Sequence, residues 1–251
     1  MISLQQTLIP WLQKNFPETL KDSSLNGLQI FSQDSVHKIG FAVSANARTL
    51  QLAKEQGVDT LIVHHGLFWG KDYGPLTGIL GQRVRQCFAS QINLIGYHLP
   101  LDGHPTLGNN AQLGQWMNWE ASQVDTHGLV YQAHIEAPSI AYIAQSLTKA
   151  LGREAIVTHA HLDLPKKNTP YHIGWCSGAG GDFMEPYNFD VFISGEFCER
   201  QYDLALETQT ILIECGHYAT ERLGVLALQK QLELLYLKQV EVVFIEQWSP
   251  W

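Results

Sequence analysis

The sequence predicts an α/β fold, formed as one compact unit with two lobes. Short apolar segments of strand length alternate along most of the chain with longer segments of helical spacing. Two of the strand segments end abruptly in polar residues, and open α/β sheets place their ligand chemistry at such strand ends. A length of 251 residues is enough for a well-buried core. We therefore expect one domain over residues 1–251, with lobes at 1–125 and 126–251.

The composition is that of an ordinary globular protein with few charges. Hydrophobic residues make up 45% of the chain, and 16 Lys and Arg stand against 24 Asp and Glu, a net charge of -8. This balance disfavours nucleic-acid binding on the outer surface, because Lys and Arg carry most phosphate affinity. Cys87, Cys176, Cys198 and Cys215 are widely spaced, so we expect reduced thiols. With neither a basic leader nor a long apolar stretch, the N-terminal segment predicts a cytoplasmic protein without a membrane anchor.

The first half of the chain is predicted to form a helix followed by β-α-β units. Leu4, Leu8 and Leu12 recur at helical spacing and predict an amphipathic first helix. The predicted strands of this half lie within 22–30 and over 37–43, 60–63 and 93–97. The predicted helices cover 44–56, 82–90 and 109–117, and the segment 66–81 is a loop rich in glycine and aromatic residues.

The second half has a similar β-α rhythm without a convincing repeat. Its predicted strands cover 130–135, 156–161, 171–176, 189–193, 210–214 and 240–245. Its predicted helices cover 140–151, a segment that begins at 194–196, and a long segment that begins near 216 and ends at 237. Residues 163–170 are predicted to form a surface loop.

The segment Asp59–Gly66 carries two adjacent histidines at the end of a strand. Leu61–Val63 has the length and branching of a buried strand, so His64 and His65 fall where that strand ends. Neighbouring residues on extended backbone point to opposite sides, so each histidine can serve a different metal ion, with Gly66 allowing a sharp exit. The alternative is that the two side chains only cap backbone carbonyls.

A second strand end carries His98 and Asp102. The apolar segment 93–97 is followed at once by H-L-P-L-D-G-H, so these side chains can converge with the histidine pair. Asp102-Gly103 is also a common turn dipeptide. His98 can orient a ligand or carry a proton as a catalytic residue, and a structural role is an equal alternative.

His217 and Glu221 lie four residues apart in G-H-Y-A-T-E-R. If a helix begins near Gly216, they share one face and can address one centre. Taken alone, such a pair is more typical of a solvated helix face.

Taken together, these segments supply three imidazoles and two carboxylates. This set suits zinc, iron, manganese or nickel better than magnesium or calcium, and the absence of thiolates argues against a structural zinc site. Five ligands exceed the need of one open catalytic ion, but they suit two ions about 3.5–4 Å apart that share a carboxylate. We predict His64 and Asp102 on one ion, His65 and His217 on the other, and Glu221 between them.

Three other segments are weaker candidates. Ser177–Gly181 can cradle a phosphate, but a tight turn is the better interpretation. Ser194–Glu196 indicates a helix start at which Glu196 stabilises the N-terminus. Cys215 is near His217 in sequence, but no cysteine has the arrangement of a nucleophile.

The motifs together resemble the GTP cyclohydrolase 1 type 2 homolog family, also called Nif-three-like, in its short bacterial form. The resemblance covers nearly the whole chain, and its motifs lie at 64–70, 97–110, 176–181, 193–196 and 216–222. The chain departs from the family pattern in lacking a tryptophan before D-S-S-L-N-G-L-Q and a histidine in the helix after Gly195-Glu196. Neither departure removes a predicted ligand.

The resemblance implies a two-lobed layered α/β fold, with mixed sheets flanked by helices and a metal site between the lobes. It implies a dinuclear centre with His64, His65, Asp102, His217 and Glu221 as ligands, the last of them bridging. It also implies a toroidal homohexamer and a hydrolase that uses a metal-activated water to open the purine ring of GTP. Hydrolysis of another nucleotide or a phosphate ester is an open alternative. The rival class is a non-enzymatic metal-binding ring that acts through partners, in metal handling or DNA-damage tolerance.

Overall fold

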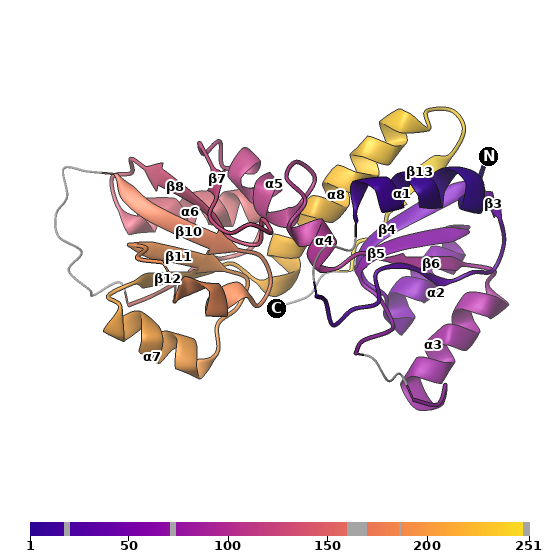
Figure 1. The fold of residues 1–251 in the computed structure, drawn as a ribbon, viewed down its shortest axis with the longest axis horizontal. Coiled ribbons are helices and arrows are strands. Elements are labelled where there is room, and N and C mark those ends of the chain that lie inside the picture. Colours follow the sequence, from indigo (N-terminus) through magenta and orange to yellow (C-terminus); the bar gives the residue numbers. More distant parts are fainter. Residues whose placement is uncertain (18–20, 71–73, 160–169, 186, 248–251) are drawn as a thin grey trace. The chain divides into compact units, whose positions relative to one another are not determined.

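The protein has a mixed α/β structure in which sheets are flanked by helices (Figure 1). The structure is a computed structural model and describes residues 1–17, 21–70, 74–159, 170–185 and 187–247. The described residues form two compact units: Met1–Leu101 with residues 224–247, and Asp102–Leu223. The predicted lobe boundary at 125/126 lies inside the second unit, and those lobes stay a prediction.

The first unit contains a five-stranded sheet with the order β13-β4-β5-β6-β2. Its strands are β2 (Gly27–Ile30), β4 (Lys38–Ser44), β5 (Thr60–His65), β6 (Asn93–Gly96) and β13 (Glu241–Phe244). The strands from β13 to β6 are parallel, and β2 pairs antiparallel with β6 at the edge. A separate antiparallel pair joins β1 (Ile2–Ser3) to β3 (Ser35–Val36). Parallel β5 and β6 therefore deliver the residues at their carboxyl ends to one edge of the sheet.

Helices cover the sheet of the first unit on both faces. They are the π-helix η1 (Leu4–Leu8), α1 (Ile9–Asn15), α2 (Ala47–Glu55) and α3 (Gly78–Ala89), followed by α4 (Leu99–Asp102). Figure 1 shows α2 and α3 on one side of the strands and α1 on the other. Leu50 of α2 and Cys87 of α3 pack in one core cluster with Leu61 and Val63 of β5. Leu4, Leu8 and Leu12 are fully buried, so the amphipathic first helix is confirmed.

The second unit contains a six-stranded sheet with the order β7-β8-β10-β11-β12-β9. Its strands are β7 (Ser122–Gln123), β8 (Tyr131–Ile135), β9 (Ile156–Thr158), β10 (Tyr171–Cys176), β11 (Val191–Ser194) and β12 (Ile211–Glu214). The central strands β10, β11 and β12 are parallel, and β8 and β9 flank them antiparallel. The helices are α5 (Asn109–Trp116), α6 (Ile140–Leu151), the 3-10 helix η2 (Gly180–Met184), α7 (Glu199–Glu207) and α8 (His217–Leu235), whose later part belongs to the first unit.

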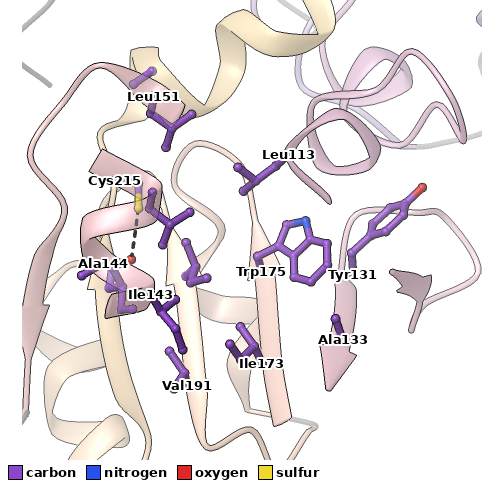
Figure 2. Close-up of a cluster of buried hydrophobic side chains, with 14 of the residues drawn as sticks. Leu113, Tyr131, Ala133, Ile143, Ala144, Leu151, Ile173, Trp175, Val191 and Cys215 are labelled. Atoms are coloured by element: carbon purple, nitrogen blue, oxygen red, sulfur yellow. Dashed lines mark hydrogen bonds between the residues drawn. The ribbon is translucent and has the colours of Figure 1, made fainter. Parts of the chain in front are cut away.

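Trp175 on β10 lies in the hydrophobic core of the second unit (Figure 2). Its side chain is fully buried, and its indole Nε1 donates a hydrogen bond to the carbonyl oxygen of Asn110 at 2.9 Å. Leu113 of α5, Ile143 of α6 and Ile213 of β12 belong to the same cluster. The indole thus joins α5 to the sheet through both packing and a satisfied polar atom.

Several element boundaries differ from the sequence prediction. Strand β5 continues through both histidines, because Ser44 of β4 still pairs with His65. Asp102 ends a helical turn after β6 and does not stand at the strand end itself. Helix α7 begins at Glu199, since Cys198 and Gln201 form a capping box there, so the predicted helix start at 194–196 is wrong. Most of the predicted loop 163–170 lies outside the described residues.

The described helices and cysteines bear on the remaining expectations from the sequence. Within the described ranges, none of the helices has both the length and the apolar stretch of a membrane-spanning segment. All four cysteines are unbridged, and burial raises the pKa of the Cys215 thiol to about 12. A buried thiol with so high a pKa is a poor nucleophile, so Cys215 is a core residue.

Replacing Ile173 by alanine should destabilise the second unit. Ile173 is fully buried on β10, and deleting its methyl groups leaves a cavity that costs about 2–5 kcal/mol. Ile156→Ala is the matched control, because Ile156 is 50% exposed on β9. Urea unfolding followed by circular dichroism measures both, and equal losses would contradict the assignment of the core.

Candidate metal centre

Three histidines converge in the first unit. His64 and His65 end β5, and His98 follows β6 after one intervening residue. One ligand atom from each of the three lies within 4.8 Å of the others. The ring centroids of His64 and His65 are 4.6 Å apart, although neighbouring residues on a strand point to opposite faces. The two rings nevertheless lie close together at the end of β5, where one group of ligands can form.

Each of these imidazoles is held through its Nδ1 atom. His64 Nδ1 lies 2.9 Å from the carbonyl oxygen of Tyr97, and His65 Nδ1 lies 3.0 Å from Ser44 Oγ. His98 Nδ1 lies 2.8 Å from Asp22 Oδ1. A carbonyl or carboxylate oxygen only accepts, so Nδ1 of His64 and of His98 donates, and the lone pair in the neutral ring is on Nε2. This orientation suits imidazoles that bind a metal ion.

Gly66 is needed for close packing at the end of β5. A Cβ on Gly66 would lie 2.1 Å from Gln29 Nε2. Gln29 in turn accepts a hydrogen bond from the backbone N–H of Leu67 at 2.8 Å and donates to the carbonyl of Leu25 at 2.6 Å. The absence of a side chain at Gly66 lets the Gln29 side chain lie against the backbone. Gln29 then holds the backbone directly after the histidine pair through its hydrogen bond with Leu67.

Asp22 is a site residue that the sequence analysis missed. Its carboxylate accepts hydrogen bonds from His98 and, at 3.0 Å, from Asn26 Nδ2 and the backbone N–H of Leu99. Burial raises the pKa of Asp22, but the hydrogen bonds from His98, Ser24 and Asn26 outweigh it and hold the pKa well below its usual range. The ionised carboxylate therefore fixes the orientation of the His98 ring.

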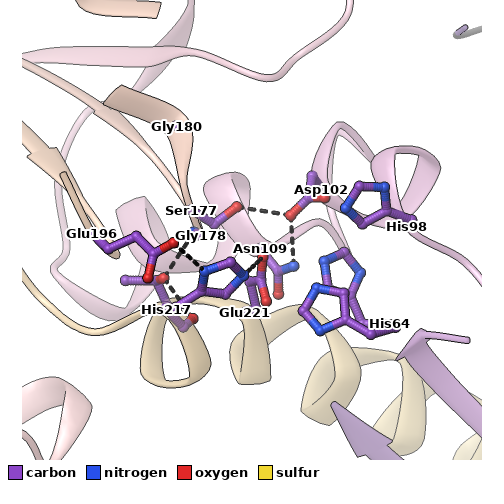
Figure 3. A network of polar contacts seen from close by, with 12 residues as sticks. His64, His98, Asp102, Asn109, Ser177, Gly178, Gly180, Glu196, His217 and Glu221 are labelled. Atoms are coloured by element: carbon purple, nitrogen blue, oxygen red, sulfur yellow. Dashed lines mark hydrogen bonds and ion pairs between the residues drawn. The ribbon is translucent and has the colours of Figure 1, made fainter. Parts of the chain in front are cut away.

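The second unit brings His217, Glu221 and Glu196 together (Figure 3). Helix α8 begins at His217, so its first turn places His217 Nε2 3.0 Å from Glu221 Oε1. His217 Nδ1 lies 3.3 Å from Glu196 Oε1. Glu196 precedes α7 by two residues and contacts His217, so its predicted role at a helix N-terminus is wrong. The motif S-G-E drew attention to Glu196 in the sequence, but its contact with His217 depends on the tertiary fold.

Asp102 is held by two buried polar side chains of the same unit. Its Oδ1 accepts hydrogen bonds from Ser177 Oγ at 2.7 Å and from Asn109 Nδ2 at 2.8 Å (Figure 3). One ligand atom of Asp102 and one of Glu221 lie within 4.8 Å of each other. Both side chains are buried, and two carboxylates at this separation favour a bound cation. Glu221 thus lies close to both Asp102 and His217, and its role as a bridging ligand stays a prediction.

Two glycine motifs make room for the pair His217 and Glu221. Gly178 has a φ of +60°, and a Cβ there would lie 2.2 Å from Glu221 Oε1 and 3.3 Å from His217 Nε2. A Cβ on Gly195 would lie 2.7 Å from the Cα of His217. The predicted tight turn at Ser177–Gly181 is a bend that enters η2 at Gly180, and its backbone lies against the candidate ligands.

The two carboxylates control the charge of His217. Burial lowers its pKa, but the hydrogen bond and charge of Glu221, together with the charge of Glu196, raise it to about 9. In the metal-free protein His217 is thus protonated at neutral pH. A metal ion must displace that proton, because only the neutral ring offers a nitrogen lone pair to the ion.

Residues that can hold a metal ion are present in each unit. His64, His65 and His98 lie in the first unit, and Asp102, His217 and Glu221 lie in the second. The candidate donors are imidazole nitrogens and carboxylate oxygens, which are ligand types that zinc, iron, manganese and nickel accept. The assignment of particular ligands to particular ions stays a prediction.

Comparison with known proteins gives the family. The family model described as Duf34/NIF3 (NGG1p interacting factor 3) matches residues 5–250. The chain belongs to the Duf34/NIF3 family. A relative from Neisseria meningitidis, named GTP cyclohydrolase 1 type 2 homolog, is 35% identical over 253 aligned residues that cover 98% of this chain and 99% of the relative. The resemblance stated from the motifs is confirmed.

Solved structures similar to this chain have the same fold. The protein ybgI, described as of unknown function, is 30% identical with a TM-score of 0.88, and the match covers 100% of both chains. TTHA1606 from Thermus thermophilus is 32% identical with a TM-score of 0.84 over 98% of both chains. The fold class predicted from the sequence is therefore confirmed.

Replacing Gly178 by alanine should displace the Glu221 carboxylate. The variant should then lose bound metal, and in the metal-free protein the pKa of His217 should fall from about 9 toward its ordinary value. Gly152→Ala is the matched control, because Gly152 has a φ of +70° with nothing within 4 Å of an added Cβ. Both variants carry the backbone strain of about 1–2 kcal/mol. Elemental analysis measures the metal content of both variants, and NMR titration measures the pKa of His217. Equal metal content in the two variants would contradict this role of Gly178.

The pH dependence of stability should report the His217 contacts in metal-free protein. The pKa of His217 is raised to about 9 in the folded state, so its contribution is fully present below an unfolded pKa of about 6.5 and is lost as the pH rises through 9. The difference in unfolding free energy between wild type and His217→Gln should therefore shrink from about pH 6 to about pH 10. Urea unfolding with a chelator measures it; a difference that grows with pH would refute the assignment.

Proposed function

We propose that this protein is a metal-dependent hydrolase that acts on a nucleotide. Its metal ligands are His64, His65, Asp102, His217 and Glu221, and they bind two divalent ions. The observation that supports this proposal best is the arrangement in the first unit, where His64, His65 and His98 converge within 4.8 Å with each Nδ1 held. Imidazoles fixed in this way before any ligand binds are typical of metal sites.

Divalent ions held by these five residues would supply a bound water of lowered pKa and polarisation of the substrate. The residues of the chain supply the remaining functions. His98 is the proton carrier: it takes or gives a proton at Nε2 while Asp22 holds its Nδ1 at 2.8 Å. Ser177 and Asn109 fix the carboxylate of Asp102.

The substrate class comes from the relatives. Proteins of the family with about a third of their residues identical to this chain are named GTP cyclohydrolase 1 type 2 homolog. From this name we infer that the substrate of this protein is a nucleotide. Opening of the purine ring of GTP is the reaction to test first. The proposal also includes a homohexamer in the cytoplasm. Light scattering after size-exclusion chromatography tests the oligomeric state.

Metal content and turnover test the proposal together. Wild-type protein should bind divalent metal and hydrolyse GTP, another nucleotide or a phosphate ester only when loaded, and Glu221→Ala should lose both properties. His98→Ala should keep its metal but lose about 10²- to 10⁴-fold in kcat, because a positioned proton carrier contributes that much. His127→Ala, at an exposed histidine of the second unit, is the control.

The outcomes of this experiment separate the candidate functions. Protein that binds no metal under any loading condition would refute the site. Metal binding without turnover on any of these substrates would favour the rival class, a non-enzymatic metal-binding ring that acts through partners.

A further inference from the structure

Trp69 lies beside the histidine cluster with much of its indole exposed. The residue is 40% exposed, whereas a tryptophan normally buries most of its surface. Its ring centroid is 4.9 Å from that of His98 in an edge-to-face contact and 5.8 Å from that of His65. One part of the indole therefore packs on the two imidazoles, and the exposed part remains available to a ligand at the same place.

The orientation of this indole is fixed by the backbone around it. Trp69 Nε1 donates a hydrogen bond to the carbonyl of Gly66 at 3.1 Å, and Trp69 forms an isolated antiparallel bridge with Ser24. The neighbouring N–H of Gly70 donates to the carbonyl of Ser23 at 2.5 Å, and the carbonyl of Phe68 accepts from Leu25 at 3.0 Å. A side chain whose ring nitrogen is hydrogen-bonded and whose backbone is paired on both sides loses little conformational entropy when a ligand stacks on its ring.

The chemistry of an indole narrows the kind of ligand. Its Nε1–H is already satisfied within the chain, so what Trp69 offers to a ligand is an apolar aromatic surface. Aromatic bases stack on such surfaces with about 1–3 kcal/mol per base, whatever the base, because every base has a π-face. A substrate without an aromatic ring, such as a simple phosphate ester, gains little from it.

We propose that Trp69 is a positioning residue that stacks the base of a nucleotide substrate beside His65 and His98. This inference rests on the proposed hydrolase and deepens it, because it selects nucleotides over phosphate esters that lack a base. The base lies against the indole, and the ring carbon of the base that is hydrolysed lies at the imidazoles. Binding energy from the base thus orients the reacting atoms.

The test compares two probes and two exposed tryptophans. The probes are GTP and ribose 5-triphosphate, which shares the sugar and phosphates but has no base. In metal-loaded protein, Trp69→Leu should weaken GTP binding about ten-fold or more and leave ribose 5-triphosphate binding unchanged, whereas Trp69→Phe should keep most of the GTP affinity. Trp116→Leu is the control, since Trp116 is 48% exposed on α5 of the second unit.

Isothermal titration calorimetry gives each Kd, turnover gives KM and kcat, and elemental analysis gives the metal content. Equal weakening of both probes in Trp69→Leu, or no weakening of either, overturns the stacking role while the hydrolase proposal stands. Loss of metal from Trp69→Leu assigns the residue to support of the histidine cluster and also overturns stacking. A wild type that binds no metal overturns the hydrolase proposal and this inference together.

Discussion

In each unit a glycine lets the backbone approach a polar side chain closely beside the candidate ligands. At Gly66 the backbone lies where any Cβ would overlap Gln29, and this contact sets the path of the chain as it leaves the histidine pair. At Gly178 the backbone lies against Glu221 in a left-handed conformation. In both places the space that a Cβ would fill is occupied by another side chain, Gln29 at Gly66 and Glu221 at Gly178. The ligands are thus positioned by packing that exists before any ion binds.

The parallel order of the central strands gives this packing its place in the fold. In the first unit, β5 and β6 run side by side and end at one edge, so residues 33 positions apart, His64 and Tyr97, share a hydrogen bond. In the second unit, β10 and β11 also end at one edge, and the backbone N–H of Glu196 donates a hydrogen bond to the carbonyl oxygen of Gly178 at 3.1 Å. Each unit therefore presents its polar residues where strands stop and helices or turns begin, as the open α/β architecture requires.

The sequence predicted what is local and missed what depends on tertiary contacts. The helical spacing of Leu4, Leu8 and Leu12 and the four-residue spacing of His217 and Glu221 are encoded within one or two turns, and the structure has both. The contact of Asp22 with His98 joins residues 76 positions apart, and no local pattern indicates it.

The boundaries that differed have the same cause. Strand β5 extends through His65 because β4 supplies a pairing partner at Ser44, although the apolar pattern ends two residues earlier. Helix α7 starts later in the chain than predicted because Cys198 forms its N-cap with Gln201. Cysteine is not among the residues that usually cap helices. In both cases a particular neighbour overrides the propensity that the sequence alone displays.

The buried carboxylates of the second unit explain why a cation is the fitting ligand. Asp102 and Glu221 are both buried, and their ligand atoms lie within 4.8 Å of each other. The thiol of Cys176 responds to this charge: its pKa is raised first by burial and then by Asp102 and Glu221. Burial lowers the pKa of His217, but the hydrogen bond and the charge of Glu221 outweigh burial and raise this pKa. A proton on His217 therefore offsets part of the negative charge in the metal-free protein, and a divalent ion that replaces this proton offsets more of it.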